Sequence, residues 1–231
     1  MAGDRVATGD LLEILGVNNK YFMHDNFPSH DHLEASNTST GSATYSHLST
    51  LLSTGLGSGA SSMVNYVRPI FNPLYATSLI KIRASAKTDI EFFFGFKETL
   101  GIPTLTMTEN HLGVYFKDGN LYFSTGRTDG LTAIYQNTLI SGADPTRWLT
   151  YKFDKGIFSW FSLPVVTPYF DGFATPEWER NAARKWSVPA KNGACSPVDQ
   201  VHYLVFYVKN ATAADKSLEV QHVTLSEIYP D

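Results

Sequence analysis

The chain has 231 residues, of which 17% are charged, and its formal net charge at pH 7 is −4. The charged fraction lies well below the roughly 25% typical of soluble domains, so most polarity comes from 20 serines and 22 threonines. No run of Lys or Arg could follow a phosphate backbone, which excludes a broad nucleic-acid footprint. The single cysteine, Cys195, cannot form an internal disulfide, which fits assembly in a reducing cytosol.

Residues 1–22 differ from the rest of the chain. Asp10-Leu11-Leu12-Glu13 has the form of a capping box and Gly16 can end a helix, which predicts a short helix over 10–15. Such a short helix needs a surface to rest on, in its own domain or in a neighbouring subunit. We interpret 1–22 as an assembly arm with four apolar contact residues: Leu11, Leu12, Ile14 and Leu15. We expect neither a signal peptide nor membrane insertion, because the apolar runs are too short.

The segment HDNFPSHDH, residues 24–32, concentrates histidine and aspartate. His30 and His32 would share one face of an extended strand, about 7 Å apart. With Asp25, or with His24 folding back, they could bind Zn²⁺. The spacing matches no familiar zinc signature, however, and these residue types are common in loops. The sequence therefore favours a solvated polar segment that precedes the folded domain, and we expect no cofactor. Titration of the histidines at a subunit contact is a further reading.

From Ser36 to Ser62, 18 of 27 residues are Ser, Thr or Gly. This composition is typical of a flexible linker. Tyrosine and leucine residues interrupt the segment, however, so short strands with polar outer faces fit equally well. Because no break in composition splits the chain, we predict one domain over 23–231.

Strand signals dominate beyond this point. DIEFFFGF, residues 89–96, is a continuous apolar run that contains one glycine, as expected of a central strand covered on both faces. LGVYFKDGNLYFSTG, residues 112–126, predicts a hairpin that turns at Asp118-Gly119. Further strands are predicted at 62–71, 78–86, 132–140, 147–154, 201–210 and 218–229. At least eight strands with almost no helix indicate an all-β sandwich or barrel.

The order of these elements resembles the concanavalin A-like jelly-roll superfamily of lectins, laminin-G-like modules and β-glucanases. Asp25-Asn26-Phe27 followed by a Ser/Thr-rich strand, the central FFFGFKE and the Asp-Gly hairpin carry the resemblance. It implies an antiparallel two-sheet β-sandwich, here with a short N-terminal helical arm and one long aromatic insert. The β-glucanase branch places its carboxylates on one strand as Glu-x-Asp-x-x-Glu, and that pattern is missing. The nearest fragments are Asp89-x-Glu91 and Glu177-x-Glu179.

The insert at 155–199 separates two strong strand signals and includes a helix candidate, PEWERNAARKW. Loops this long are usually functional or involved in assembly. Its aromatic rings could stack on sugars, or they could anchor the insert on the sandwich or on a partner. The candidate glycan- or partner-binding residues are Trp160, Tyr169, Trp178, Arg180, Arg184 and Trp186.

The absence of a catalytic constellation, together with the arm and the insert, leads us to expect a non-enzymatic structural component of a virion surface. Candidates are a capsid decoration, a head spike, or a tail or receptor-binding protein. The expected partners are copies of itself, other structural proteins of the assembly and cell-surface glycan. We expect the protein to be made in the host cytoplasm without a signal peptide and to be located on the virion surface. The alternatives are a cytoplasmic location and export without a classical signal. The competing hypotheses are a lectin-like carbohydrate-binding module and a polysaccharide-degrading enzyme with an unfamiliar site.

Overall fold

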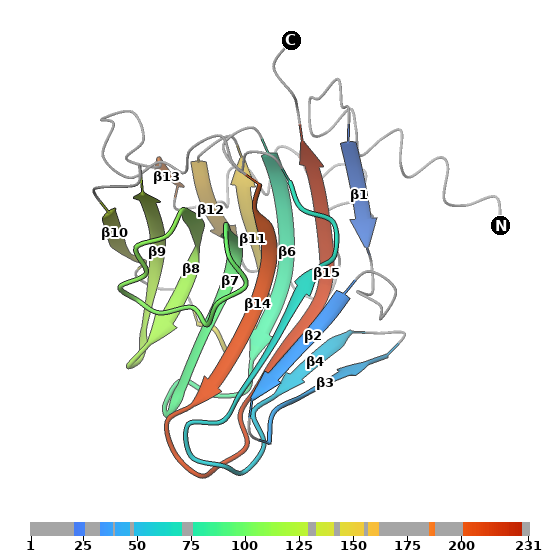
Figure 1. Cartoon of the computed structure of the whole chain (residues 1–231), viewed down its shortest axis with the longest axis vertical. Helices are drawn as coiled ribbons and strands as arrows, with labels where there is room; N and C mark the ends of the chain where they lie inside the picture. The colour runs from blue at the N-terminus through green and yellow to red at the C-terminus, as the bar shows by residue number, and fades with distance from the viewer. Residues whose placement is uncertain are drawn as a thin grey trace, which may run out of the picture.

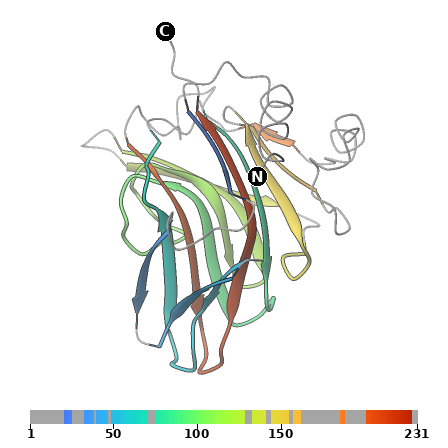
Figure 2. The ribbon, with the colours of Figure 1, turned by 90° about the vertical axis from the view of Figure 1, so that its right-hand side faces the viewer.

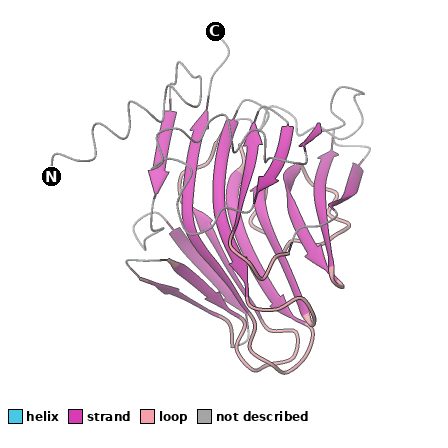
Figure 3. Ribbon diagram, turned by 180° about the vertical axis from the view of Figure 1, so that it is seen from behind, coloured by secondary structure: helices cyan, strands magenta, loops and turns pink. Residues whose placement is uncertain are grey.

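The protein is described from a computed structural model. The residues described are 21–25, 33–38, 40–46, 49–70, 76–128, 133–140, 144–154, 157–161, 185–187 and 201–227. Over these ranges every regular element is a β-strand, as Figure 3 shows from behind. Nowhere in them does a helix occur that is long and apolar enough to cross a membrane.

Two antiparallel sheets form the molecule, and they lie face to face as two curved layers (Figures 1 and 2). In spatial order, the seven-stranded sheet consists of β10 (Ala133–Ile140), β9 (Asn120–Thr128), β8 (His111–Lys117), β7 (Ile90–Lys97), β14 (Tyr203–Asn210), β5 (Ser61–Tyr66) and β2 (Leu33–Thr38). The eight-stranded sheet consists of β13 (Lys185–Ser187), β12 (Ile157–Phe161), β11 (Leu149–Asp154), β6 (Ala76–Ala84), β15 (Ser217–Glu227), β4 (Thr50–Ser53) and β3 (Ser42–Tyr45). In this second sheet β1 (Tyr21–Asp25) pairs with the C-terminal half of β15.

The chain passes repeatedly from one sheet to the other, for example between β2 and β3, between β6 and β7, and between β14 and β15. Strands β7 to β10 form a continuous run of neighbours in the seven-stranded sheet, and β11 to β13 form a shorter run in the eight-stranded sheet. This crossing pattern confirms the predicted all-β, two-sheet jelly-roll sandwich. DIEFFFGF is a central strand, because β7 lies between β8 and β14.

The Asp-Gly hairpin is also confirmed. Strands β8 and β9 pair up to Lys117 and Asn120, which leaves a two-residue turn. Asp118 and Gly119 both have positive φ angles, 51° and 78°, as a type I′ turn requires.

The core lies between the two sheets. On β7, Phe92, Phe94 and Phe96 point inward and are fully buried. Phe92 stacks on Phe116 of β8, with ring centroids 4.8 Å apart, and Phe94 meets Tyr151 of β11 edge-on at 4.6 Å. Aromatic pairs at these separations add to the free energy gained from burial. One continuous core therefore joins the two sheets.

Two segments that the sequence left ambiguous contain strands. The Ser/Thr/Gly-rich segment 36–62 contributes to four strands, β2 to β5, so the strand alternative is right and the flexible linker is wrong. Part of the insert 155–199 forms β12 and β13, which extend one edge of the eight-stranded sheet. The predicted helix over 10–15 lies outside the described residues, and the boundary at 22/23 stays a prediction.

Candidate functional site

The outer face of the seven-stranded sheet is covered by the loop 98–110, which joins β7 to β8 and crosses the sheet in Figure 1. Leu105 and Met107 of this loop pack on the sheet. The side chains beneath them form a second apolar cluster: Met63, Phe93, Tyr115, Val205 and Tyr207. Asn137 of β10 donates a hydrogen bond of 2.8 Å from Nδ2 to the carbonyl oxygen of Leu105. The loop is thus bound to the sheet by apolar and polar contacts.

Glycines allow side chains to lie flat on this face. A Cβ atom added to Gly113 would lie 2.5 Å from the ring of Phe93, and one added to Gly126 would lie 2.3 Å from the ring of His111. Gly95 has a φ of 146°, and a Cβ there would lie 2.4 Å from the Cα of Gly113. The space above these glycines is therefore occupied by the protein's own side chains and backbone.

A buried ion pair holds the base of the loop. Lys97 is fully buried, and its Nζ lies 2.5 Å from a carboxylate oxygen of Glu109 and donates to the carbonyl oxygen of Gly101 at 2.6 Å. The hydroxyl of Thr99 also donates to Glu109. Desolvation lowers the pKa of Lys97, and the hydrogen bond and charge of Glu109 oppose this effect. Lys97 therefore depends on Glu109 to remain charged inside the protein.

His111 lies beside this pair and is also fully buried. Its Nδ1 lies 2.8 Å from the carbonyl oxygen of Glu109, and its Nε2 lies 2.9 Å from the hydroxyl of Ser124. Because a carbonyl oxygen only accepts, Nδ1 carries the proton and Nε2 accepts from Ser124. Burial lowers the pKa of His111 to about 4, so the ring is neutral near pH 7. Both nitrogens are satisfied in this neutral form.

A second carboxylate of the same face is engaged as well. Glu91 accepts a hydrogen bond of 3.0 Å from the hydroxyl of Tyr115 and lies 3.3 Å from Nζ of Lys117. Burial, followed by the charge of Glu91, raises the pKa of Tyr115 far above its ordinary value. Tyr115 therefore remains a protonated donor, and Glu91 is held by two neighbours.

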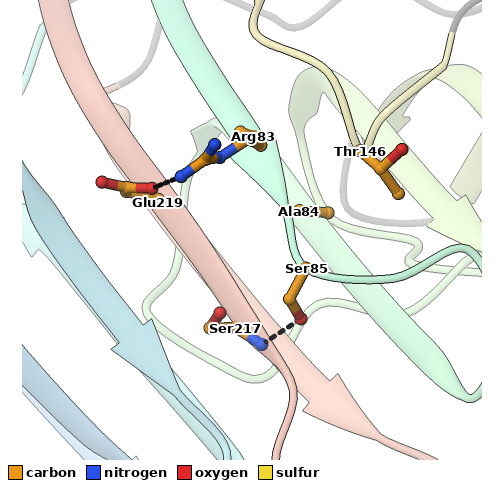
Figure 4. A pocket seen from close by; sticks show the side chains of 6 residues that line it. All are labelled: Arg83, Ala84, Ser85, Thr146, Ser217 and Glu219. Carbon is orange, nitrogen blue, oxygen red and sulfur yellow. Dashed lines mark hydrogen bonds and ion pairs between the residues drawn. The ribbon is translucent and has the colours of Figure 1, made fainter.

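The eight-stranded sheet presents an open polar hollow of about 210 Å³ (Figure 4). It lies where β6 ends and β15 begins, beside the turn 144–147. Its lining residues are Arg83, Ala84, Ser85, Thr146, Ser217 and Glu219. The backbone N–H of Ala84 donates to the carbonyl oxygen of Pro145 at 2.8 Å, which fixes the turn against the strand.

Two hydrogen-bonded pairs connect β6 to β15 in this hollow. Arg83 Nη2 lies 2.6 Å from Glu219 Oε2, and the backbone N–H of Ser217 donates to the hydroxyl oxygen of Ser85 at 2.8 Å. The other carboxylate oxygen of Glu219 accepts from Ser49 of the neighbouring segment, also at 2.8 Å. Glu219 therefore has a fixed position at the rim of the hollow.

Trp148 fixes the arginine. The guanidinium carbon of Arg83 lies 4.7 Å from the centroid of the indole ring, and Nζ of Lys81 lies 5.5 Å from it. Both distances are within the range of cation–π attraction. The guanidinium is held by Trp148 and by Glu219, which restricts the rotamers of a side chain that is otherwise 44% exposed.

Asp144 holds the turn that forms the other wall. Its Oδ1 accepts hydrogen bonds from the backbone and the hydroxyl of Thr146, at 3.0 and 2.7 Å. Its Oδ2 lies 2.8 Å from Nζ of Lys87. Desolvation would raise the pKa of Asp144, but these hydrogen bonds outweigh it and hold the pKa below its usual value. The turn therefore presents Thr146 in a fixed orientation.

The structure places few of the site residues predicted from the sequence. Trp160 is in β12 and Trp186 is in β13, two adjacent strands at one edge of the eight-stranded sheet. His24 and Asp25 are in β1, paired with β15, rather than in a loop. The remaining candidates lie outside the described residues: Leu11, Leu12, Ile14, Leu15, His30, His32, Tyr169, Trp178, Arg180 and Arg184. Among the residues that are described, no three His, Cys, Asp or Glu side chains gather as a metal site would require.

Sequence reasoning missed the hollow. Lys81 and Arg83 alternate with apolar residues along β6, which was visible as a strand signal. Glu219 is 136 positions away from Arg83, and only the pairing of β6 with β15 brings the two together. No local pattern in the sequence marks that pairing as a site.

The sequence matches no protein-family model and no curated protein. Solved structures do match over nearly the whole chain. The catalytic domain of an endo-1,3-β-glucanase (laminarinase) from Thermotoga petrophila is 10% identical, with a TM-score of 0.55, over 92% of this chain and 98% of that one. At this identity the match shows a shared fold.

Two further structures agree. A glycoside hydrolase family 16 endo-glucanase from Bacteroides ovatus is 8% identical, with a TM-score of 0.52, over 88% of this chain and 99% of that one. An immunostimulatory antigen and pseudo β-1,3-glucanase of Mycobacterium tuberculosis is 9% identical, with a TM-score of 0.53, over 90% and 98%. The fold that the resemblance implied, a two-sheet jelly-roll sandwich, is thereby confirmed.

These neighbours correct two predictions. The expected non-enzymatic structural component of a virion surface is wrong, because the similar solved structures are mostly glucanases. The expectation that the chain is not an enzyme is contradicted by the same structures. Both predictions rested on a missing linear motif and on two segments, the arm and the insert, that a minimal sandwich does not need. Neither feature excludes a glucanase fold.

Proposed function

We propose that this protein is a polysaccharide-degrading enzyme whose substrate is a glucan. The observation that carries the proposal is the extent of the structural match: laminarinase and endo-glucanase domains correspond to about nine-tenths of this chain and to nearly all of their own.

Hydrolysis of a glycosidic bond needs two carboxyl groups, about 5 Å apart for retention and about 6.5–9.5 Å apart for inversion. In the described residues, Glu91, Glu109 and Glu219 each form an ion pair with one cation. The carboxyls to substitute one at a time are those of the two sequence fragments nearest to the glucanase pattern: Asp89, Glu91, Glu177 and Glu179.

The test uses the full chain on laminarin, mixed-linkage glucan, cellulose and xylan. We expect new reducing ends from laminarin, from mixed-linkage glucan or from both. Asp→Asn or Glu→Gln substitution should abolish the release of these ends at two of the carboxyls. The assay is necessary because one neighbour is named a pseudo glucanase. Binding is measured in parallel by the retardation of the protein in native gels that contain each polysaccharide. If every polysaccharide stays intact, the proposal is overturned, and retardation in the gel would then show binding without cleavage.

A further inference from the structure

The hollow on the eight-stranded sheet has the chemistry of a sugar-binding site. We propose that Arg83 and Glu219, held by Trp148 and Ser49, bind a single neutral sugar unit through two adjacent hydroxyl groups. This inference rests on the proposed action on a polysaccharide. It adds a holding site, which is a site that binds the polysaccharide without cleaving it. The site lies on the opposite sheet from the face covered by the loop 98–110.

The donors and acceptors of the hollow complement a vicinal diol. A sugar hydroxyl both donates and accepts, so two neighbouring hydroxyls are matched by one cationic donor next to one anionic acceptor. Arg83 has five N–H donors, of which one is directed at Glu219. Each oxygen of Glu219 accepts one hydrogen bond from the protein and has a second lone pair. The pair therefore has unused capacity on both partners.

Further hydroxyl groups surround the pair. Ser85 accepts from the backbone of Ser217, which leaves its own O–H able to donate. Thr146 donates to Asp144, which leaves its hydroxyl oxygen able to accept. These groups are the donors and acceptors that a third sugar hydroxyl would meet. Figure 4 shows Ser85 and Thr146 on two sides of Ala84, with the Arg83–Glu219 pair on a third.

The site is preorganised. A long arginine usually loses rotamer freedom on binding, but Trp148 and Glu219 already hold Arg83 in place. Glu219 is in turn held by Ser49. Trp148 therefore acts as a positioning residue.

Size and charge define the ligand further. A cavity of about 210 Å³ is smaller than the roughly 300–1,000 Å³ that encloses a drug-sized ligand, so it suits one sugar ring of a longer chain. The cation and the carboxylate balance each other. A uronic acid would bring its own negative charge next to Glu219, so a neutral sugar is favoured.

The experiment uses the full chain labelled with 5-fluorotryptophan. The ¹⁹F signal of Trp148 is assigned by the Trp148→Phe variant and is followed while laminaritriose or glucuronate is added. We expect saturable movement of the Trp148 signal with laminaritriose, and weaker binding of glucuronate. Arg83→Gln and Glu219→Gln should each lower the affinity at least about tenfold, because a charge-assisted hydrogen bond is lost. Glu34→Gln, an exposed glutamate on β2 of the other sheet, is the matched control and should bind as the unaltered protein does.

Each outcome decides the inference. A Trp148 signal that never moves, tighter binding of glucuronate, or unchanged affinity in both hollow variants overturns it. Unaltered thermal unfolding shows that the variants are folded. Cleavage of glucan without movement of the Trp148 signal would overturn the holding site alone. Movement of the signal without any cleavage would overturn the proposed enzyme and leave the sugar site.

Discussion

The two sheets of this sandwich have outer faces of opposite character. On the seven-stranded sheet, Lys97 and His111 are fully buried beneath the loop 98–110, and each has its partners within the protein. On the eight-stranded sheet, Arg83 and Glu219 form an equally short ion pair, but they border an open hollow. Similar side chains thus have different roles according to whether a loop covers them.

The difference is one of solvation. A charge that is removed from water must be compensated by a partner, and loss of that partner is costly. An exposed pair gains little, since water solvates each member nearly as well. The covered face should therefore determine stability, and the open face should tolerate change and remain available to a ligand.

The largest effect is expected from Gly95→Ala. The new methyl group would lie 2.4 Å from the Cα of Gly113, at a backbone φ of 146° that L-residues rarely adopt. Overpacking and backbone strain together should cost about 4 kcal/mol of unfolding free energy. Urea titration followed by circular dichroism measures it.

Gly101→Ala provides the matched control. Gly101 is in the covering loop 98–110, directly after the strand that contains Gly95, but a Cβ there would meet only the hydroxyl of Thr99, at 3.5 Å. Its stability should stay within about 0.5 kcal/mol of the original. Equal losses for the two substitutions would show that the glycines do not set the spacing on this face.

A smaller loss is expected from Glu109→Gln, which removes the carboxylate that compensates Lys97. Because Lys97 is fully buried and Glu109 is only 20% exposed, the loss should be about 3 kcal/mol. Lys97→Met should cost clearly less, since it removes the buried charge itself. Both values come from urea titration at pH 7. If Lys97→Met proves the more damaging substitution, the ion pair would be a net source of stability.

The covered face should also make stability depend on pH. His111 is neutral in the folded protein, with a pKa lowered to about 4, whereas an unfolded histidine titrates near 6.5. As the pH falls through 6.5 the unfolded chain takes up a proton that the folded chain does not, so stability decreases until about pH 4. Between pH 7 and pH 5 the loss from this residue should be about 2 kcal/mol.

His111→Gln isolates that contribution. The amide can still donate and accept, but it does not titrate, so the dependence between pH 7 and pH 5 should become flatter by about that amount. Asp144 does not interfere, because its pKa is held below the usual value and it titrates at lower pH. Parallel stability curves for the two proteins would refute the assignment to His111.

Much of the fold could be predicted from the sequence because its signals are local. The continuous apolar run DIEFFFGF, which predicts a central strand, and the Asp118-Gly119 turn depend on neighbouring residues, and both predictions are confirmed. The segment 36–62 was ambiguous, because Ser, Thr and Gly suit linkers as well as polar edge strands. Its strand β4 depends on pairing with β15, which is distant in the chain, and β2 depends on pairing with β5.

The candidate sites were harder to predict because they depend on pairing across the sandwich. Arg83 meets Glu219 only because β6 pairs with β15. Lys97 and His111 face each other across β7 and β8, and nothing in ENHLGVYF reveals that a loop will bury them. The sequence drew attention instead to clusters of aromatic and histidine residues, which are conspicuous along the chain whether or not they gather in space.

The smallest effect on stability is expected from Arg83→Gln, the change that also tests the hollow. Arg83 is 44% exposed, so breaking its ion pair should cost under about 1 kcal/mol, in contrast to the loss at Glu109. Some of that loss is the packing of the guanidinium on Trp148, which Arg83→Lys would retain in part. Urea titration in low and in high salt separates the contribution of the ion pair from that of the packing, because screening weakens the ion pair and leaves the packing unchanged. A loss as large as that of Glu109→Gln would mean that the open face is structural too, and that the contrast between the two sheets does not hold.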